Sequence, residues 1–305
     1  MEFLNQIIQG VLLGGYYAIL ASGLSFLFGV MRIVNLAHGS LVVLAGYLIF
    51  SACKHLGVDV PVAVLMVMPV MALLGWALNR LLLQRSLRGG MLVPILATFG
   101  LSIVVDNLLF QSFGADTRSL APNIGSLSYD SWQIVGDLYV SKLDVMTFGT
   151  AVAVLGALQL VLSRTGIGRA IRATAEDPDA VNLIGIDSRM VYSAASAIAL
   201  LLITVAALFL GMRSTFAPYA GQAQLLFAFE TVVIGGTGSL WGTLLGGIVL
   251  GVSQSIGAQI NPIGFLIAGH VVFLAILVLR VYSKVWHLRR PRLRAARAST
   301  QGAGA

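Results

Sequence analysis

Long apolar stretches with few charges recur along almost the whole 305-residue chain. A helix needs about 20 apolar residues to cross the hydrocarbon core of a bilayer, and several stretches approach that length. Hydrophobic residues make up 58% of the chain and charged residues 10%, against about 45–50% and about 25% in soluble domains. This composition excludes a water-soluble domain and predicts an integral membrane protein with several spans.

The spans are predicted to be helices. A membrane β-barrel would show segments of about ten residues with alternating polarity, whereas these runs are long and do not alternate. The 34 glycines suit membrane helices, in which small residues let backbones approach closely. The predicted fold class is all-α, a polytopic membrane helical bundle of about eight or nine transmembrane segments.

Polar residues interrupt the apolar pattern in two regions, 30–46 and 219–247, where discontinuous helices are expected. Broken helices are tolerated at membrane depth only where they are buried or line a cavity. Gly39-Ser40-Leu41 resembles Gly238-Ser239-Leu240, which indicates either an internal repeat or only a glycine-rich composition. The spans are placed at residues 5–29, 38–53, 60–80, 91–112, 145–163, 190–211, 221–238, 241–258 and 263–283.

The distribution of charge predicts the topology. Arginines cluster near 80–88 and 164–189, and basic residues fill 284–305; by the positive-inside rule these segments face the cytoplasm. The link 113–144 carries four aspartates and two basic residues, and it should lie outside. Its aromatic residues could form a small hairpin or an ordinary surface loop at headgroup level.

These assignments define one transmembrane domain over residues 1–283, with an external loop 113–144 and a cytoplasmic loop 164–188. Residues 284–305 form a basic cytoplasmic tail, which could anchor the orientation or contact anionic lipid. The acidic residue Glu2 and the lack of a small-residue cleavage site argue against a removable signal peptide. The single Cys53 is expected to pack in the interior.

Strong helix signals occur in the middle of the cytoplasmic loop. Asp177 is a good N-cap, Pro178 suits the first helical position and Gly185 fits the residue after the helix. They predict a short helix over 178–184. Its expected apolar face, which another surface should cover, contains Ala180, Val181 and Ile184.

At these residues the chain resembles a known family. The stretch Ala175 to Ala180, with Gly185 to Asp187 after it, is similar to the cytoplasmic motif of branched-chain amino-acid permeases of the LivH type. Gly29 to Gly39 and Phe229 to Gly247 also resemble that family, and the likeness extends from about Gly10 to Tyr282. In that family the motif is the coupling loop that engages an ATP-binding subunit. The resemblance therefore implies coupling residues Ala175, Glu176, Asp177, Pro178, Asp179, Ala180, Leu183 and Gly185.

The resemblance implies a permease subunit of an ATP-driven (ABC) importer for branched-chain amino acids or related small polar solutes. The expected partners are a second homologous permease subunit, two cytoplasmic ATP-binding subunits, a periplasmic solute-binding protein and membrane lipid, with no nucleic acid and no cofactor. The expected location is the bacterial inner membrane, with the C-terminus in the cytoplasm.

Enzymatic activity is not expected from the chain itself. It lacks a phosphate-binding P-loop and the HExxH and GxSxG motifs, and four histidines with one cysteine do not suggest a metal cluster. The alternative function is a self-sufficient channel or secondary transporter for a small neutral solute such as urea or an amide. The capped cytoplasmic helix favours the ATP-coupled permease, since a channel has no need to present one.

Several polar residues inside the spans are candidates for the transport path, because such residues usually face a bundle interior or a water-filled cavity. Glu230 should point inward, toward a cation such as Arg32 or Arg213. Asp106 could line the path or form a hydrogen bond between helices, and His270 is a weaker candidate. Each could also be a structural hydrogen-bonding group. The predicted path passes Asn35, His38, Thr98, Glu230 and Thr237, at the interface with a second permease subunit.

Overall fold

The computed structural model describes residues 2–86, 89–90, 92–135 and 138–301, and their side chains as far as Tyr282 apart from those of residues 2, 134, 135 and 138. Within these residues, eight helices are long and apolar enough to cross a membrane, which confirms the polytopic helical bundle. They are α1 (Glu2–Met31), α2 (His38–Leu56), α3 (Val60–Leu78), α5 (Leu92–Phe113), α6 (Lys142–Arg164), α9 (Ser188–Arg213), α11 (Leu240–Ile260) and α12 (Gly264–Gln301).

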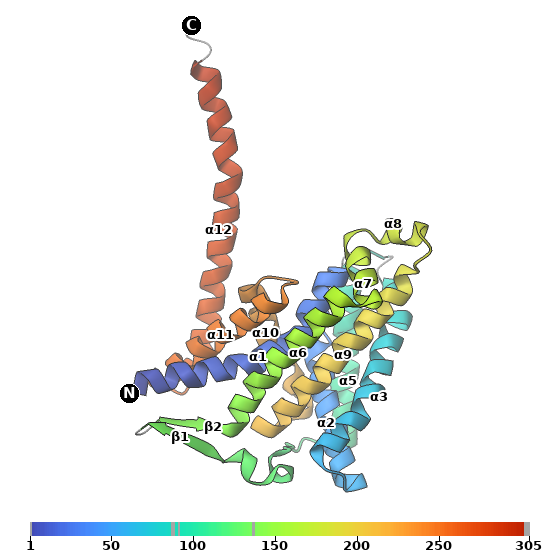
Figure 1. Ribbon diagram of the computed structural model, residues 1–305, viewed down its shortest axis with the longest axis vertical. Helices are drawn as coiled ribbons and strands as arrows, with labels where there is room; N and C mark the ends of the chain where they lie inside the picture. Colours follow the sequence, from blue (N-terminus) through green and yellow to red (C-terminus); the bar gives the residue numbers. More distant parts are fainter. Residues whose placement is uncertain (1, 87–88, 91, 136–137, 302–305) are drawn as a thin grey trace.

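Shorter elements connect and interrupt these helices. α3 continues as a π-helix over Asn79–Leu83 and then as α4 (Gln84–Ser86), and single 3-10 turns cover Ala121–Asn123, Gly125–Ser128 and Pro218–Ala220. The hairpin of β1 (Ser131–Val135) and β2 (Leu138–Ser141) lies at one end of the bundle, and α7 (Gly166–Glu176) and α8 (Pro178–Leu183) lie at the other (Figure 1). The 15-residue α10 (Gly221–Gly235) is too short to cross alone.

α1 and α9 form the centre of the bundle, and α12 lies at its edge. In the most apolar window of each span, 78% of α1 and 72% of α9 are buried, against 6% of α12. α1 packs closely on α11 because glycines face the contact: a Cβ on Gly14 would lie 2.5 Å from the Ile248 Cα. The first part of α12 packs on α11 and α10, and the rest of the helix extends past the bundle (Figure 1). The side chains of the predicted tail 284–305 lie outside the described residues.

The chain breaks after α1 and returns into the bundle. Arg32 adopts a left-handed φ of 54°, and residues 32–35 are not helical. His38, the first residue of α2, donates from Nε2 to the Leu20 carbonyl oxygen at 2.7 Å. At 1.5 Å of rise per residue, Leu20 lies about 16 Å before the end of α1. α2 therefore begins at membrane depth.

A second break follows α9, and the helix after it begins beside α2. Gly221, the first residue of α10, packs on Ser40, and a Cβ on Gly39 would lie 1.8 Å from the Gly221 carbonyl oxygen. From this crossing α10 runs toward the Gly29 end of α1, where Gly238 follows it. α2 runs the opposite way. The predicted span 221–238 is thus a half-helix, and discontinuous helices are confirmed in both predicted regions.

The predicted external link contains a hairpin, one of the two forms expected from its aromatic residues. Trp132 pairs with Val140 and Gln133 with Tyr139. The same loop also binds the segment at the second break, because Arg118 and Phe216 exchange two backbone hydrogen bonds of 2.9 Å. It is therefore an ordered brace across the end of the bundle.

Candidate translocation path and coupling surface

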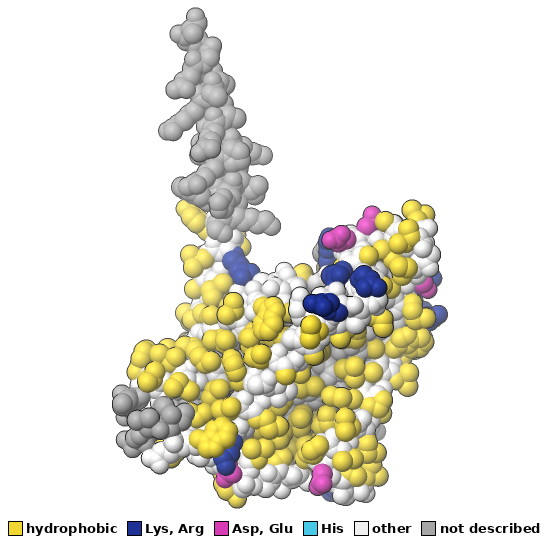
Figure 2. All heavy atoms as spheres, viewed as in Figure 1, with side chains coloured by type: hydrophobic (Ala, Val, Ile, Leu, Met, Phe, Trp, Pro, Cys, Tyr) yellow, Lys and Arg dark blue, Asp and Glu magenta, His cyan; other side chains and the backbone are white. Residues whose placement is uncertain are grey.

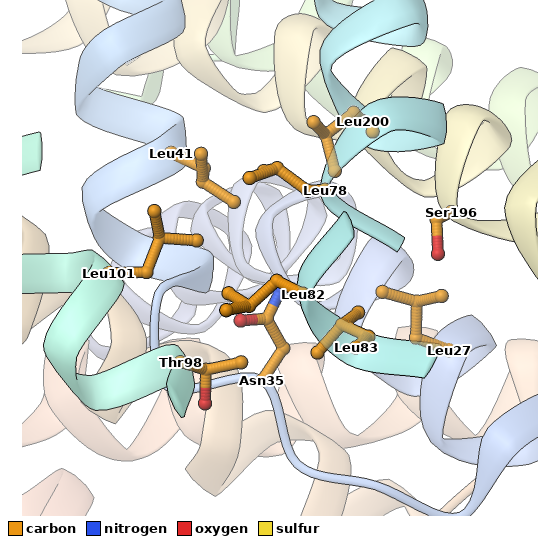
Figure 3. A pocket seen from close by; sticks show the side chains of 11 residues that line it. Leu27, Asn35, Leu41, Leu78, Leu82, Leu83, Thr98, Leu101, Ser196 and Leu200 are labelled. Carbon is orange, nitrogen blue, oxygen red and sulfur yellow. The ribbon is translucent and has the colours of Figure 1, made fainter. Parts of the chain in front are cut away.

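Three of the predicted path residues meet at the first break and hold its backbone in place. Thr98 Oγ1 accepts a hydrogen bond of 3.1 Å from the Leu36 N–H, and Asn35 Oδ1 accepts one of 3.0 Å from the Ala37 N–H. Asn35, His38 and Thr98 are all buried. Figure 3 shows Asn35 and Thr98 next to each other at one edge of a small cavity, whose wall consists mostly of leucines. In this arrangement the side chains of Asn35 and Thr98 accept hydrogen bonds from backbone N–H groups that no helix pairs, and they do not reach an open surface.

Glu230 makes a different contact from the one expected. Its Oε1 lies 2.5 Å from His270 Nδ1 on α12, and its side chain is buried. The expectation of Arg32 or Arg213 as partner was wrong: Arg213 pairs with Asp144, and Arg32 is exposed. Arg213 ends α9 before the break, whereas Glu230 lies nine residues along α10, so the two reach different depths.

His270 is a residue whose importance the sequence analysis underestimated. Its ring stacks on Phe227 at 6.4 Å between centroids, and Arg280 on the same helix donates to the Ile234 carbonyl oxygen at 2.7 Å. Both contacts join the peripheral α12 to the half-helix α10. The available signal was the buried carboxylate itself, since an acid inside a membrane requires a partner, and His270 lies in the last apolar span.

The five predicted path residues do not form one continuous lining. Thr237 is exposed in the loop between α10 and α11, between Gly236 and Gly238, which both have positive φ. Asn35, His38 and Thr98 surround the first break, and Glu230 faces α12. Asp106, the other buried acid, lies beside Ser40 where α2 and α10 begin, a position at which a carboxylate is favourable for the helix dipoles.

An open groove lies in front of the first break. It has a volume of about 520 Å³ and is lined by Val34 and Leu36 of the return segment together with the outer face of α10. Gln222 and Ala223 are exposed there. Non-helical backbone at membrane depth must be buried in protein or line a water-filled cavity. This groove therefore needs a protein partner, an aqueous path, or both, and sequence reasoning did not identify Gln222.

The short helix predicted in the loop 164–188 forms with the predicted caps. Asp177 Oδ1 accepts hydrogen bonds of 3.0 Å from the N–H groups of Asp179 and Ala180. At the other end, Gly185 has φ 87°, and the Ile186 N–H donates to the Val181 carbonyl oxygen at 3.2 Å. This is the glycine-terminated helix end known as a Schellman motif. α8 ends one residue earlier than predicted.

The apolar face of α8 differs from the prediction. Val181 packs inward and is buried, whereas Leu183 and Ile184 are 89% and 73% exposed. Because the left-handed turn at Gly185 ends the helix, Ile184 does not share the face of Val181. α8 projects at the end of the molecule opposite the hairpin (Figure 1). The predicted coupling residues on this projection are Ala175, Glu176, Asp177, Pro178, Asp179, Ala180, Leu183 and Gly185.

Comparison with known proteins gives relatives that cover most of the chain. It is 32% identical over 270 residues, 85% of this chain and 87% of the relative, to the high-affinity branched-chain amino acid transport system permease protein BraD of Pseudomonas aeruginosa. It is 27% identical over 272 residues, again 85% and 87%, to the corresponding protein LivH of Escherichia coli. It is also 27% identical over 260 residues, 80% of this chain and 69% of the relative, to the fructose import permease protein FrcC of Rhizobium meliloti.

A family model also covers both breaks. The model of the family described as branched-chain amino acid transport system / permease component matches residues 6–281, which include all or nearly all of each of the eight spans found in the described residues. The chain therefore belongs to this family of multi-pass membrane permeases.

Proposed function

We propose that this chain is the membrane-spanning subunit of an ATP-driven importer that moves branched-chain amino acids or related small polar solutes. The family membership and the names of BraD and LivH support the solute class. The relative named for fructose import means that the fold alone does not select the solute.

The observation that carries the proposal is the irregular backbone at membrane depth beside an open groove. Val34 and Leu36 line the groove together with the exposed side of α10. The backbone polar groups of such a non-helical segment need hydrogen-bond partners from water or protein. A second homologous permease subunit covers this face, and the solute passes between the two subunits.

The predicted path residues act by positioning the backbone beside this groove. Asn35, His38 and Thr98 hold the return segment in place from the side that faces the bundle. Glu230 fixes α10 through His270, and Thr237 lies at the inner mouth.

The cytoplasmic surface of α8 supports an ATPase partner. Leu183 and Ile184 are exposed on this surface. Burial of one such side chain against a partner would stabilise the complex by about 1.5–3 kcal/mol. Three acidic residues lie at the other end of α8, at positions 176, 177 and 179. Two ATP-binding subunits, one on each permease subunit, bind this projection. When the two ATP-binding subunits close around nucleotide, the projection transmits their movement to the spans. A periplasmic solute-binding protein delivers the solute at the hairpin end.

The charges support an orientation with α7, α8 and the C-terminus in the cytoplasm. Arg164, Arg169, Arg172 and Arg189 lie around α7 and α8, and the positive-inside rule places them there. In this orientation the hairpin faces the periplasm of a bacterial inner membrane.

Purification of the tagged chain in mild detergent tests the assembly. We expect two ATPases and a second permease subunit to accompany it, and uptake into proteoliposomes to require ATP. Recovery of this chain alone, active without ATP, would contradict the proposal and favour a channel or secondary transporter.

Two variants test the surfaces. Leu183→Asp should abolish ATP-driven uptake without unfolding the spans, whereas Leu56→Asp, which places the same charge at the opposite end, should not. In a Cys53→Ser background, Gln222→Cys should react with a water-soluble maleimide in the assembled complex, whereas the lipid-facing Leu245→Cys should not. An unreactive Gln222→Cys with normal uptake would remove the groove from the path.

A further inference from the structure

Another cavity lies at the cytoplasmic end of the bundle, on a different side of α1 from the groove. It has a volume of about 310 Å³, and α1, α6, α7 and the start of α11 enclose it. Its wall combines apolar side chains, including Phe26 and Leu162, with the polar side chains of Gln159, Arg172 and Ser239. No aspartate or glutamate lines it among the described residues.

The charge at this cavity comes from α7. Gly168, Ile171 and Thr174 are buried along one face of this helix, while Arg169 and Arg172 are exposed. A Cβ on Gly168 would lie 2.3 Å from the Val161 carbonyl oxygen of α6, so the glycine lets α7 fold tightly onto the end of that span. Figure 2 shows Lys and Arg side chains gathered at this end of the molecule. No ion pair among the described residues includes Arg172.

The other side of the cavity continues as an apolar stripe on α11. Trp241 at the cavity rim, Leu245 and Val249 are spaced four residues apart and are 45%, 64% and 40% exposed. Residues at this spacing lie on one face of a helix. Tryptophan is favoured at the level of the lipid headgroups, so the stripe extends from the interface into the hydrocarbon region.

We propose that this cavity is a binding site for an anionic phospholipid, with the phosphate at Arg172 and an acyl chain along Trp241, Leu245 and Val249. About 310 Å³ lies at the small end of the range for ligand sites, which fits a headgroup but not a whole two-chain lipid. Arginine is well suited to phosphate, and a basic amphipathic helix beside an interfacial tryptophan is typical of a lipid surface. A free phosphate would leave the apolar stripe without a partner.

Fluorescence of Trp241 tests this site directly. The other tryptophans, Trp76, Trp132 and Trp286, are replaced by phenylalanine in the full chain, which is placed in nanodiscs with brominated phosphatidylglycerol or brominated phosphatidylcholine. We expect stronger quenching by the anionic lipid. Arg172→Gln should weaken the apparent affinity of the site for brominated phosphatidylglycerol about fivefold, because one arginine near a membrane surface contributes about 1 kcal/mol to binding of anionic lipid.

Two further variants separate the site from a general surface charge. Arg85→Gln removes the same charge at the same end but lies outside the cavity, and it should leave quenching unchanged. Gln159→Phe fills the cavity while keeping Arg172, and it should reduce quenching by the anionic lipid. Equal quenching by the two lipids, or an equal effect of Arg85→Gln, would overturn the proposal. Quenching by neither lipid would also overturn it, because a protein surface would then cover Trp241.

Discussion

The two breaks in the bundle look alike in the path of the chain but are held in different ways. Each follows a long central helix, α1 or α9, and each returns the chain to the depth where Gly39 meets Gly221. At the first break, buried side chains bind the backbone: Thr98 and Asn35 accept from the N–H groups of the return segment. These contacts lie entirely within the bundle.

The second break is braced from outside. Phe216 pairs through its backbone with Arg118 of the loop 113–144, and its buried ring lies 5.1 Å from the ring of Tyr47, measured between centroids. Arg213, just before the break, pairs with Asp144 at the start of α6. The first break therefore depends on side chains within the membrane, whereas the second depends on a loop in contact with water. Four predictions test this difference.

The largest effect is expected where the two breaks meet. Gly39→Val places side-chain atoms against the Gly221 carbonyl group, where even a Cβ would lie at 1.8 Å. Backbone cannot yield as a flexible side chain does, so the cost should exceed about 3 kcal/mol. We expect little folded protein by size-exclusion chromatography. Gly100→Ala on α5, where nothing lies within 4 Å, should behave as the parent; equal behaviour of both variants would contradict the close crossing.

The next effect concerns the second break. Arg213→Gln leaves Asp144 without its partner, and both side chains are largely buried. We expect a loss of about 2–3 kcal/mol, between the values for exposed and buried pairs, measured by thermal unfolding in nanodiscs. The double variant with Asp144→Asn should lose less than the sum of the single variants. Additive losses would show that the pair does not brace the break.

A smaller loss is expected at the first break. Thr98→Val keeps the shape of the side chain but removes the acceptor of the Leu36 N–H, and an unsatisfied donor costs about 1–2 kcal/mol. Thr150→Val is the matched control, because its hydroxyl group bonds only the preceding turn of its own helix. If both variants melted at the same temperature, the side-chain account of the first break would be wrong.

The smallest effect is a pH dependence confined to the external brace. The hydrogen bond from Lys142 lowers the pKa of Asp130, so the folded state binds its proton less readily than the unfolded chain. The stabilisation is present above the unfolded pKa of about 3.9 and is lost as pH falls through the lower folded value. Asp130→Asn should lower the melting temperature slightly at pH 6; this difference should begin to shrink at about pH 4 and disappear once the pH is below the folded pKa of Asp130. A difference that persists at low pH would contradict this origin.

Local signals in the sequence predicted α8 well because both ends of the helix are closed by its own residues. Asp177 caps the N–H groups two and three residues later, and Gly185 ends the helix through its own backbone angle. Val181 is buried as predicted, but the exposure of Ile184 was not predictable in this way. It depends on how α8 lies on α7 and α9, which no pattern within 178–184 contains.

The partner of Glu230 illustrates the same limit over a longer distance. Burial of an acid in an apolar run implied that some partner exists, but charge alone favoured the arginines. His270 became the partner because α12 packs beside α10 forty residues later in the chain.

The sequence by itself determined that the chain crosses a membrane as helices, approximately where eight of them lie, which segments carry positive charge and where helices are interrupted. These properties follow from the length of apolar runs and from local backbone preferences. Only the tertiary structure decided that Gly39 meets Gly221, that Asn35 and Thr98 lie behind the groove, and that Arg172 faces a cavity beside Trp241. Contacts between distant segments depend on how complete helices pack, and glycines that permit a close crossing do not specify which helix will occupy it.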